Sequence, residues 1–249
     1  MTVFVTGATS GFGAAVVQRF AKDGAKIVGT GRRGDRLEKL KIQLGSNFLP
    51  LAFDVSKREE VGKVISGLPE DFASVDVLVN NAGLALGLEP AQEADLDDWE
   101  TMVDANVKGV MYCTRALLPG MVRRGRGHII TVGSTAAEWP YPGGNVYGAT
   151  KAFVHQFALN LRADLIGTAI RVTDVQPGMA EGTEFSETRF KGDTKRAQAV
   201  YQGTNALNAD DVADAIHWAA TRPAHVNINT LQLMPTSQAF GPLAVARKK

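Results

Sequence analysis

The chain has 249 residues, of which 45% are hydrophobic and 21% charged, and its formal net charge at pH 7 is +1. The apolar content excludes a disordered chain, and 27 basic against 26 acidic side chains argue against a dedicated nucleic-acid binder. The single cysteine, Cys113, excludes an internal disulfide framework and a zinc cluster built on cysteines. Without a signal-peptide pattern or an uncharged apolar run of roughly 18 residues, we expect a cytoplasmic protein without membrane association.

Apolar strand-like runs alternate with amphipathic helical stretches from one end of the chain to the other. The expected strands cover residues 2–6, 26–30, 48–53, 75–79, 127–132, 169–175 and 229–234. The expected helices cover residues 11–23, 35–44, a segment after Ser56, and residues 97–124, 145–166 and 210–221. Ser56 and Glu59 have the spacing of a capping box, and Asp95 is the expected N-cap of the long helix.

Strands separated by helices must pair in parallel, because each connection crosses over the sheet in the right-handed sense. The sequence therefore predicts an α/β protein with a single doubly wound, parallel, seven-stranded sheet and helices on both faces. We expect one domain over residues 1–249. Residues 178–208 interrupt the alternation, and this long, polar, irregular connection is typical of an active-site lid.

A glycine-rich turn, Thr-Gly-Ala-Thr-Ser-Gly-Phe-Gly, follows the first strand at residues 6–13. Here the pyrophosphate of a dinucleotide can approach bare backbone and the positive end of a helix dipole. The spacing is Gly-x-x-x-Gly-x-Gly, and a turn that binds nothing is the alternative, which its place after the first strand disfavours. The expected cofactor-binding residues of this turn are Gly7, Thr9, Ser10, Gly11, Phe12 and Gly13.

The end of the second strand indicates which dinucleotide is bound. An NAD site usually has an acidic residue there, which accepts a hydrogen bond from the ribose 2′-hydroxyl. This chain has Arg32 and Arg33 instead, and the planar guanidinium fork matches the oxygens of a 2′-phosphate. The two arginines favour NADP. The alternative is that they are only solvated at a helix start, where the helix dipole opposes them.

Two further strand ends meet at the same edge of the predicted sheet. Asp54 follows the third strand and could accept a hydrogen bond from the adenine amine or cap the turn before Ser56. Asn81, Ala82 and Gly83 follow the fourth strand. Their small side chains would let a cofactor lie across the strand ends, while the asparagine could tie neighbouring strands together.

Tyr147 and Lys151 are four residues apart in a predicted helix, so their side chains share one face. Such a pair is weak evidence alone, but Ser134 lies at the carboxyl end of the fifth strand, where ligands bind in open α/β sheets. A hydroxyl, a phenol and an ammonium group suit proton transfer to or from a substrate oxygen. Positive charge from the lysine and a nicotinamide would lower the pKa of Tyr147 from about 10 towards the working pH.

These motifs, in this order, resemble the short-chain dehydrogenase/reductase family, whose sheet is of the Rossmann type, over nearly the whole chain. The resemblance implies that Tyr147 is the general acid/base and that Ser134 orients and polarises the substrate oxygen. Lys151 would hold the nicotinamide ribose and lower the pKa of the phenol, and Asn106 would hold a water that connects this lysine to solvent. It also implies a homotetramer. Further residues expected to contact the cofactor are Val55, Pro177, Gly178 and Thr183.

Residues 182–186, 189–193 and 223–229 resemble more narrowly the NADP-dependent 3-hydroxy acid dehydrogenases, a group with serine and allo-threonine dehydrogenases and malonic semialdehyde reductases. This implies an NADP(H)-dependent oxidoreductase that interconverts an alcohol and its carbonyl, with a small 3-hydroxy acid or β-hydroxy amino acid as substrate. A broad-specificity carbonyl or β-ketoacyl reductase is the alternative, and a non-catalytic NADP-sensing module is a minor one. One departure is Gly182, which stands where much of the wider family has threonine, so that the threonine here is Thr183.

Charged residues of the lid bear on the substrate. The carboxylate of a hydroxy acid needs a positive or donor-rich partner, and we expect Arg189 to provide it, the alternatives being a surface role for this arginine or a carboxylate bound by backbone N–H groups. Glu138 and Glu181 would repel an anionic substrate if they lined the pocket, and we expect both to face solvent. The histidines have no metal-ligand spacing, so we assign no metal site, and residues 247–249 should form a loose tail.

Overall fold

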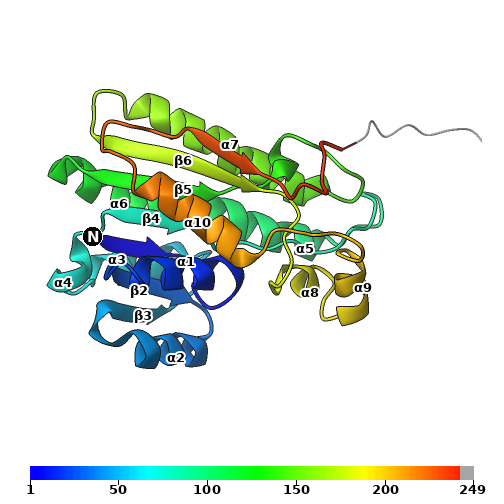
Figure 1. The fold of residues 1–249 in the computed structure, drawn as a ribbon, viewed down its shortest axis with the longest axis horizontal. Coiled ribbons are helices and arrows are strands. Elements are labelled where there is room, and N and C mark those ends of the chain that lie inside the picture. The colour runs from blue at the N-terminus through cyan, green and yellow to red at the C-terminus, as the bar shows by residue number, and fades with distance from the viewer. Residues whose placement is uncertain (242–249) are drawn as a thin grey trace, which may run out of the picture.

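Seven parallel strands form one sheet in the computed structural model, which describes residues 1–241 (Figure 1). The strands are β1 (Thr2–Val5), β2 (Lys26–Gly31), β3 (Phe48–Ala52), β4 (Val77–Asn80), β5 (Gly127–Val132), β6 (Ile170–Pro177) and β7 (Thr230–Leu233). Their order across the sheet is β3-β2-β1-β4-β5-β6-β7, and every neighbouring pair is parallel. The predicted fold is confirmed. The strand order reverses between β1 and β4, which is where ligands bind in doubly wound sheets.

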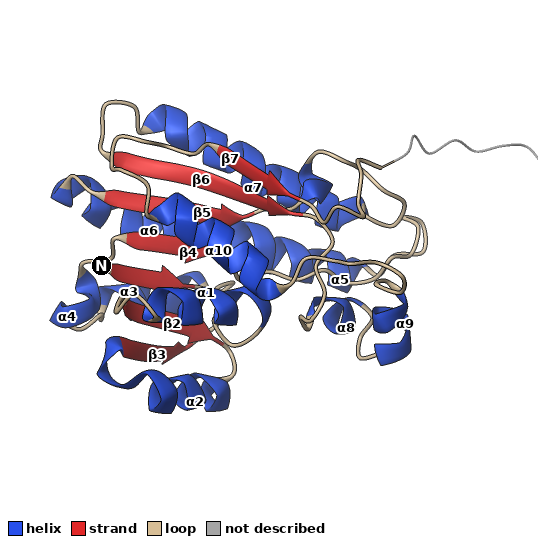
Figure 2. Ribbon diagram, in the orientation of Figure 1, coloured by secondary structure: helices blue, strands red, loops and turns tan. Residues whose placement is uncertain are grey.

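Helices cover both faces of the sheet (Figure 2). They are α1 (Gly11–Ala21), α2 (Gly34–Leu44), α3 (Arg58–Ser66), α4 (Glu70–Ala73), α5 (Leu96–Val103), α6 (Gly109–Arg124), α7 (Asn145–Asp164), α8 (Phe185–Arg189), α9 (Thr194–Ala199) and α10 (Ala209–Ala220). Helices α1 and α10 pack together on one face, while α3 and α6 pack together on the other. The short α8 and α9 lie near the end of the sheet to which the strand arrows point (Figure 2).

The strands bury apolar side chains on both faces, as a parallel sheet covered by helices requires. In β1, Val3 and Val5 belong to the cluster under α1 and α10, whereas Phe4 belongs to the cluster under α3 and α6, because successive side chains of a strand point to opposite faces. The second cluster includes Cys113 of α6, which is fully buried. Burial raises the pKa of the Cys113 thiol to about 12.

Two helix starts test the predicted caps. Asp95 is the N-cap of α5, and its carboxylate accepts a hydrogen bond from the backbone N–H of Asp97 at 3.0 Å. The capping box predicted at Ser56 is wrong, since α3 begins only at Arg58. The backbone N–H of Ser56 instead donates to the Asp54 carboxylate at 2.9 Å, so this segment turns before the helix begins.

The long helix predicted over residues 97–124 is interrupted by one wide turn. Residues Asp104–Lys108 form a π-helical turn between α5 and α6. Such turns insert one residue into an α-helix and often mark functional sites. Asn106 lies inside this turn and is buried.

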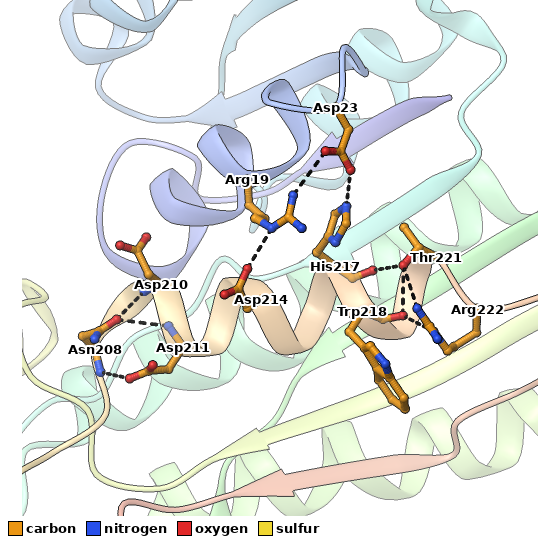
Figure 3. A network of polar contacts seen from close by, with 10 residues as sticks. All are labelled: Arg19, Asp23, Asn208, Asp210, Asp211, Asp214, His217, Trp218, Thr221 and Arg222. Carbon is orange, nitrogen blue, oxygen red and sulfur yellow. Dashed lines mark hydrogen bonds and ion pairs between the residues drawn. The ribbon is translucent and has the colours of Figure 1, made fainter.

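Polar contacts connect α1 to α10 and cap the start of α10 (Figure 3). His217 Nε2 lies 2.6 Å from a carboxylate oxygen of Asp23, and Arg19 Nε donates to Asp214 at 2.7 Å. The side chain of Asn208 accepts from the backbone N–H of Asp211 at 3.0 Å, and the Asp211 carboxylate accepts from the backbone N–H of Asn208 at 2.9 Å. This reciprocal pair is a capping box.

Candidate functional site

The turn between β1 and α1 is packed so closely that it excludes side chains at two glycines. Gly7 has a φ of +68°, and a Cβ on Gly13 would lie 2.1 Å from the carbonyl oxygen of Gly7. Asn81 holds the turn against the end of β4, because its side-chain amide donates to the carbonyl oxygens of Thr6 (2.9 Å) and Gly7 (3.2 Å). Among the described residues no side chain caps α1 at Ser10, so the first N–H groups of the helix can bind an anion.

Of the two arginines after β2, Arg33 reaches the glycine-rich turn. Its guanidinium donates to the hydroxyl oxygens of Thr9 (3.0 Å) and Ser10 (2.8 Å). Arg32 is exposed. The structure therefore places Arg33, and not Arg32, against the residues that sequence assigned to the dinucleotide.

Two residues that the sequence analysis missed complete this cluster of charges. The carboxylate of Glu184, in the predicted lid, contacts Arg33 Nη1 at 2.6 Å and Arg36 Nη1 at 2.5 Å. Burial by itself would raise the pKa of Glu184, but the hydrogen bonds and positive charges of both arginines outweigh it and hold the pKa below its usual value. Arg36 could have been predicted from the sequence, because residues three apart at a helix start lie next to each other, as Arg33 and Arg36 do.

The remaining predicted cofactor residues lie along the carboxyl ends of β1, β3, β4 and β6. The Asp54 carboxylate caps its own turn, as one of its two predicted roles required. Val55 packs against α6, where a Cβ on Gly109 would come within 2.8 Å of it. Thr183 of the lid approaches Gly11, where a Cβ would lie 3.3 Å from the threonine Cβ.

Ser134, Tyr147 and Lys151 come together beyond the end of β5. Tyr147 and Lys151 lie on one face of α7, and the ammonium nitrogen is 5.9 Å from the centre of the phenol ring. Lys151 Nζ also donates to the carbonyl oxygen of Val132 at 2.8 Å. Ser134 lies two residues beyond β5, and its hydroxyl oxygen accepts from the backbone N–H of Ala136 at 3.1 Å.

Burial shifts the pKa of the two ionisable groups in opposite directions. Burial raises the pKa of Tyr147 to about 12, against a hydrogen bond with Ser134 and the charge of Arg189, both of which lower it. Burial lowers the pKa of Lys151 to about 8, while the carboxylate of Asp174 raises it. Loss of water therefore disfavours the phenolate of Tyr147 more than the charge of Arg189 favours it. The lowering of this pKa by Lys151 together with a bound nicotinamide stays a prediction.

Asn106 connects the π turn to two neighbouring segments. Its side-chain amide donates to the carbonyl oxygen of Leu84 (2.8 Å) and to the hydroxyl of Thr150 (3.0 Å), and its oxygen accepts from the Leu84 N–H (2.8 Å). Gly83 lies between Asn106 and Lys151, since a Cβ there would be 2.9 Å from Asn106 Oδ1 and 3.7 Å from Lys151 Nζ. The wide turn therefore brings Asn106 close to the predicted catalytic lysine.

Two adjoining cavities lie between the sheet and the lid. One of about 320 Å³ is lined by Ser134, Tyr147 and Arg189, and also by Phe12, Pro177, Gly178 and Thr183. The other, of about 590 Å³, is lined by Thr9, Ser10, Gly11, Arg36 and Glu184, with Thr183 common to both. The lid thus borders both the predicted catalytic residues and the predicted cofactor residues.

The two carboxylates that raised doubt about an anionic substrate lie outside the cavity of Ser134 and Tyr147, as far as the described residues show. Glu138 has an oxygen 4.0 Å from His155 Nε2 and is partly exposed. Glu181 lines the larger cavity beside Thr9 and Glu184, so the expectation that it points away from the cavities to solvent is wrong.

The partly buried side chain of Arg189 places a cation in the smaller cavity. Its guanidinium carbon is 5.0 Å from the centre of the Tyr147 ring and 5.1 Å from that of Phe185, and Nη2 donates to the hydroxyl of Tyr141 at 2.8 Å. Its Nε is buried and has no hydrogen-bond partner among residues 1–241. A buried donor without a partner is costly, so an acceptor brought by a ligand would stabilise this side chain.

Within the described residues, none of the helices has the length and apolarity needed to cross a bilayer, and no group of three or more His, Cys, Asp or Glu side chains is placed to hold a metal ion. The predicted tail at residues 247–249 lies outside the described residues.

Comparison with known proteins places the chain in a family. Residues 1–194 match the family model of short chain dehydrogenases. An NADP-dependent 3-hydroxy acid dehydrogenase of Salmonella typhi is 58% identical over 99% of this chain and 100% of its own length. A serine 3-dehydrogenase of Rhizobium radiobacter is 51% identical over 99% of this chain and 98% of its own length.

Solved structures agree. The closed form of a serine dehydrogenase complexed with NADP⁺ is 56% identical, superimposes with a TM-score of 0.98 and is matched over 100% of both chains. The serine dehydrogenase of Escherichia coli gives 52% identity and a TM-score of 0.87, over 96% of this chain and 100% of that one. The chain therefore belongs to the short-chain dehydrogenase/reductase family.

Proposed function

We propose that the protein is an NADP-dependent dehydrogenase that interconverts a small 3-hydroxy acid, or a β-hydroxy amino acid such as serine, and the corresponding carbonyl compound. The observation that carries this proposal is the partly buried Arg189, whose buried Nε has no partner among the described residues, in one cavity with Ser134 and Tyr147. The activities named for the similar proteins, on 3-hydroxy acids and on serine, support it.

The residues at the strand ends fit NADP. Gly7 and Gly13 leave no room for side chains, and the uncapped start of α1 suits a pyrophosphate. The hydroxyls of Thr9 and Ser10 with Arg33 suit a 2′-phosphate, and Arg32 stays a predicted partner from the sequence. Further residues proposed to hold the cofactor are Gly11, Phe12, Asp54, Val55, Asn81, Ala82, Gly83, Tyr147, Lys151, Pro177, Gly178 and Thr183. When bound, NADP⁺ supplies the acceptor for the hydride of the carbinol carbon.

Side chains of the protein, and not the coenzyme, transfer the proton. The Tyr147 hydroxyl exchanges the proton with the substrate oxygen, and Ser134, which lines the same cavity, holds that oxygen in place. The Lys151 ammonium, 5.9 Å from the ring centre, stabilises the phenolate while the proton is away. Asn106 holds a water that returns protons to this lysine from solvent.

The cation in the cavity selects the substrate. A carboxylate beside Arg189 would accept a hydrogen bond from its buried Nε and neutralise its charge, and charge-assisted hydrogen bonds of this kind are about twice as strong as neutral ones. A general carbonyl reductase does not need a cation in its substrate cavity. A protein that only senses NADP has no use for Ser134, Tyr147 and Lys151 together.

The test compares a 3-hydroxy acid with its uncharged methyl ester in the wild type and in Arg189→Ala. We expect kcat/KM for the acid to fall by at least about tenfold, or 1.4 kcal/mol, while that for the ester changes little. Arg196→Ala, which removes a lid arginine stacked on Phe190, is the matched control and should leave both substrates unaffected. Equal losses for acid and ester would remove Arg189 as the anchor. A wild type that prefers the ester would instead favour a general carbonyl reductase.

Three wider features belong to the same proposal. Residues 1–249 form one dinucleotide-binding and catalytic domain with a lid at about 178–208, a role supported by the contribution of this segment to both cavities. The protein works as a cytoplasmic homotetramer. The exposed apolar side chains of Met111 on α6 and of Phe153 and Leu159 on α7 support an interface through these helices.

A further inference from the structure

An anion site is built between the glycine-rich turn and the start of α2. Arg33 donates to the hydroxyls of Thr9 and Ser10, and Arg33 and Arg36 both point a guanidinium nitrogen at one further acceptor. That acceptor is the carboxylate of Glu184, which offers one oxygen to each arginine. A protein carboxylate therefore binds the guanidinium groups that suit a phosphate.

The contact is exchangeable. The side chains of Arg33, Arg36 and Glu184 are each between 38% and 40% exposed, so water and solutes reach them. Ion pairs as exposed as these contribute about 0–1 kcal/mol each, and a ligand with more charge and more acceptor oxygens displaces them easily. A phosphate monoester carries nearly two negative charges and three acceptor oxygens.

We propose that Glu184 is an internal competitor of the 2′-phosphate of NADP for Arg33 and Arg36. This inference rests on the proposed coenzyme. Two guanidinium groups balance a phosphate dianion, and a third negative charge beside that dianion is repelled. Binding of the 2′-phosphate releases Glu184 from the arginines, whereas NAD, which has a hydroxyl there, leaves the contact in place.

The contact of Glu184 with Arg33 and Arg36 also connects coenzyme binding to the lid. Glu184 directly precedes α8, and α8 ends at Arg189, the residue proposed to bind the substrate carboxylate. Helix α8 is short and connects the two residues directly. The contact of Glu184 with the arginines therefore fixes one end of α8, and Arg189 lies at the other end.

The experiment measures dissociation constants by calorimetry for NADP⁺, NAD⁺, adenosine 2′,5′-bisphosphate and adenosine 5′-phosphate, without substrate, so turnover does not enter. In Glu184→Gln, we expect NADP⁺ and the bisphosphate to bind at least about fivefold more tightly, as loss of two exposed ion pairs implies. The two ligands without a 2′-phosphate should bind as in the wild type. Glu187→Gln removes an exposed carboxylate three residues further on and should change all four constants by less than twofold, within ordinary screening.

Two results would overturn the inference. Weaker binding of NADP⁺ by Glu184→Gln would mean that the carboxylate holds the arginines ready for the phosphate, and unchanged binding would mean that it does not compete. The proposed coenzyme fails separately, if the wild type binds NAD⁺ as tightly as NADP⁺. A wild type that prefers NADP⁺, with no tightening in Glu184→Gln, would reject only the competition.

Discussion

Tyr147 and Lys151 both keep their protons near neutral pH, although burial moves the pKa of the first to about 12 and that of the second to about 8. Because a buried phenolate is disfavoured even with Lys151 and Arg189 beside the ring, we expect Tyr147 to release its proton only when coenzyme and substrate are bound.

The Tyr147→Phe variant removes the hydroxyl and keeps the ring that packs against Phe185. We expect kcat to fall by at least about 10²-fold, because a positioned acid/base is lost, while NADP⁺ binding measured by fluorescence is largely retained. Tyr141→Phe is the comparison variant, since it removes only the hydroxyl that Arg189 bonds. It should raise KM for a hydroxy acid more than it lowers kcat. Near-normal turnover by Tyr147→Phe would contradict the assignment.

His128 makes the stability of the fold depend on pH. It is 1% exposed in β5, its Nε2 lies 2.8 Å from the hydroxyl of Thr173, and burial, with a smaller effect of Arg171, lowers its pKa to about 3. Between pH 6.5 and 3 the unfolded chain binds a proton here that the folded chain does not bind, so stability falls as pH falls. From pH 7 to pH 5 this one group removes about 2 kcal/mol.

Urea unfolding of the wild type and of His128→Asn at pH 7 and pH 5 measures this effect. Asparagine does not titrate, so we expect the wild type to lose about 2 kcal/mol more than the variant over this interval. For each protein we compare the change in free energy of unfolding between pH 7 and pH 5, so the destabilisation caused by the substitution itself cancels. Equal differences would show that His128 does not titrate as its burial requires.

At the scale of helices, local sequence predicted where elements lie better than how they begin. The pattern at Ser56 and Glu59 has the spacing of a capping box, but the Asp54 carboxylate takes the N–H of Ser56 and the chain turns before α3 begins. The box that does form is at Asn208 and Asp211, where each side chain accepts from the backbone N–H of the other residue. Whether a capping box forms depends on which neighbouring group accepts the hydrogen bond from the backbone N–H, and the spacing of residues in the sequence does not determine this.

The Asn208→Ala variant tests the capping box that starts α10. We expect the free energy of unfolding to fall by about 1 kcal/mol, because two N–H groups lose their acceptor. Asn208→Asp keeps a side-chain oxygen at the cap and should restore most of this loss. A full loss in the aspartate variant would show that the destabilisation has another origin.

The site, too, has residues that the sequence could locate and contacts that it could not. Ser134, Tyr147, Lys151 and Asn81 could be found from the sequence, because parallel strands place their carboxyl ends at one edge. The contact of Glu184 with Arg33 and Arg36 could not, because the lid has no periodicity that fixes where its side chains point. The raised pKa of Tyr147 also depends on burial that only packing reveals.

At the scale of the whole molecule, the proposed tetramer is open to a direct measurement. Light scattering at micromolar concentration should give about four times the chain mass of 26.6 kDa. Phe153→Asp puts a charge on the exposed apolar face of α7 and should produce smaller species. Ile42→Asp places the same charge on α2, at a side chain that is 83% exposed, and should leave the mass unchanged. A wild-type mass near 26.6 kDa would contradict the proposal.

The buried thiol of Cys113 in α6 can be used to measure how often the core opens. Cys113 is the only cysteine of the chain, it is fully buried, and its raised pKa keeps it as the unreactive thiol. An alkylating reagent therefore modifies the protein only as fast as the core between α6 and the sheet opens. One reaction, followed by the mass of the intact chain, thus reports how often the core around Cys113 opens, and a ligand that binds only the native state slows that reaction by a factor of one plus the ratio of free ligand concentration to Kd.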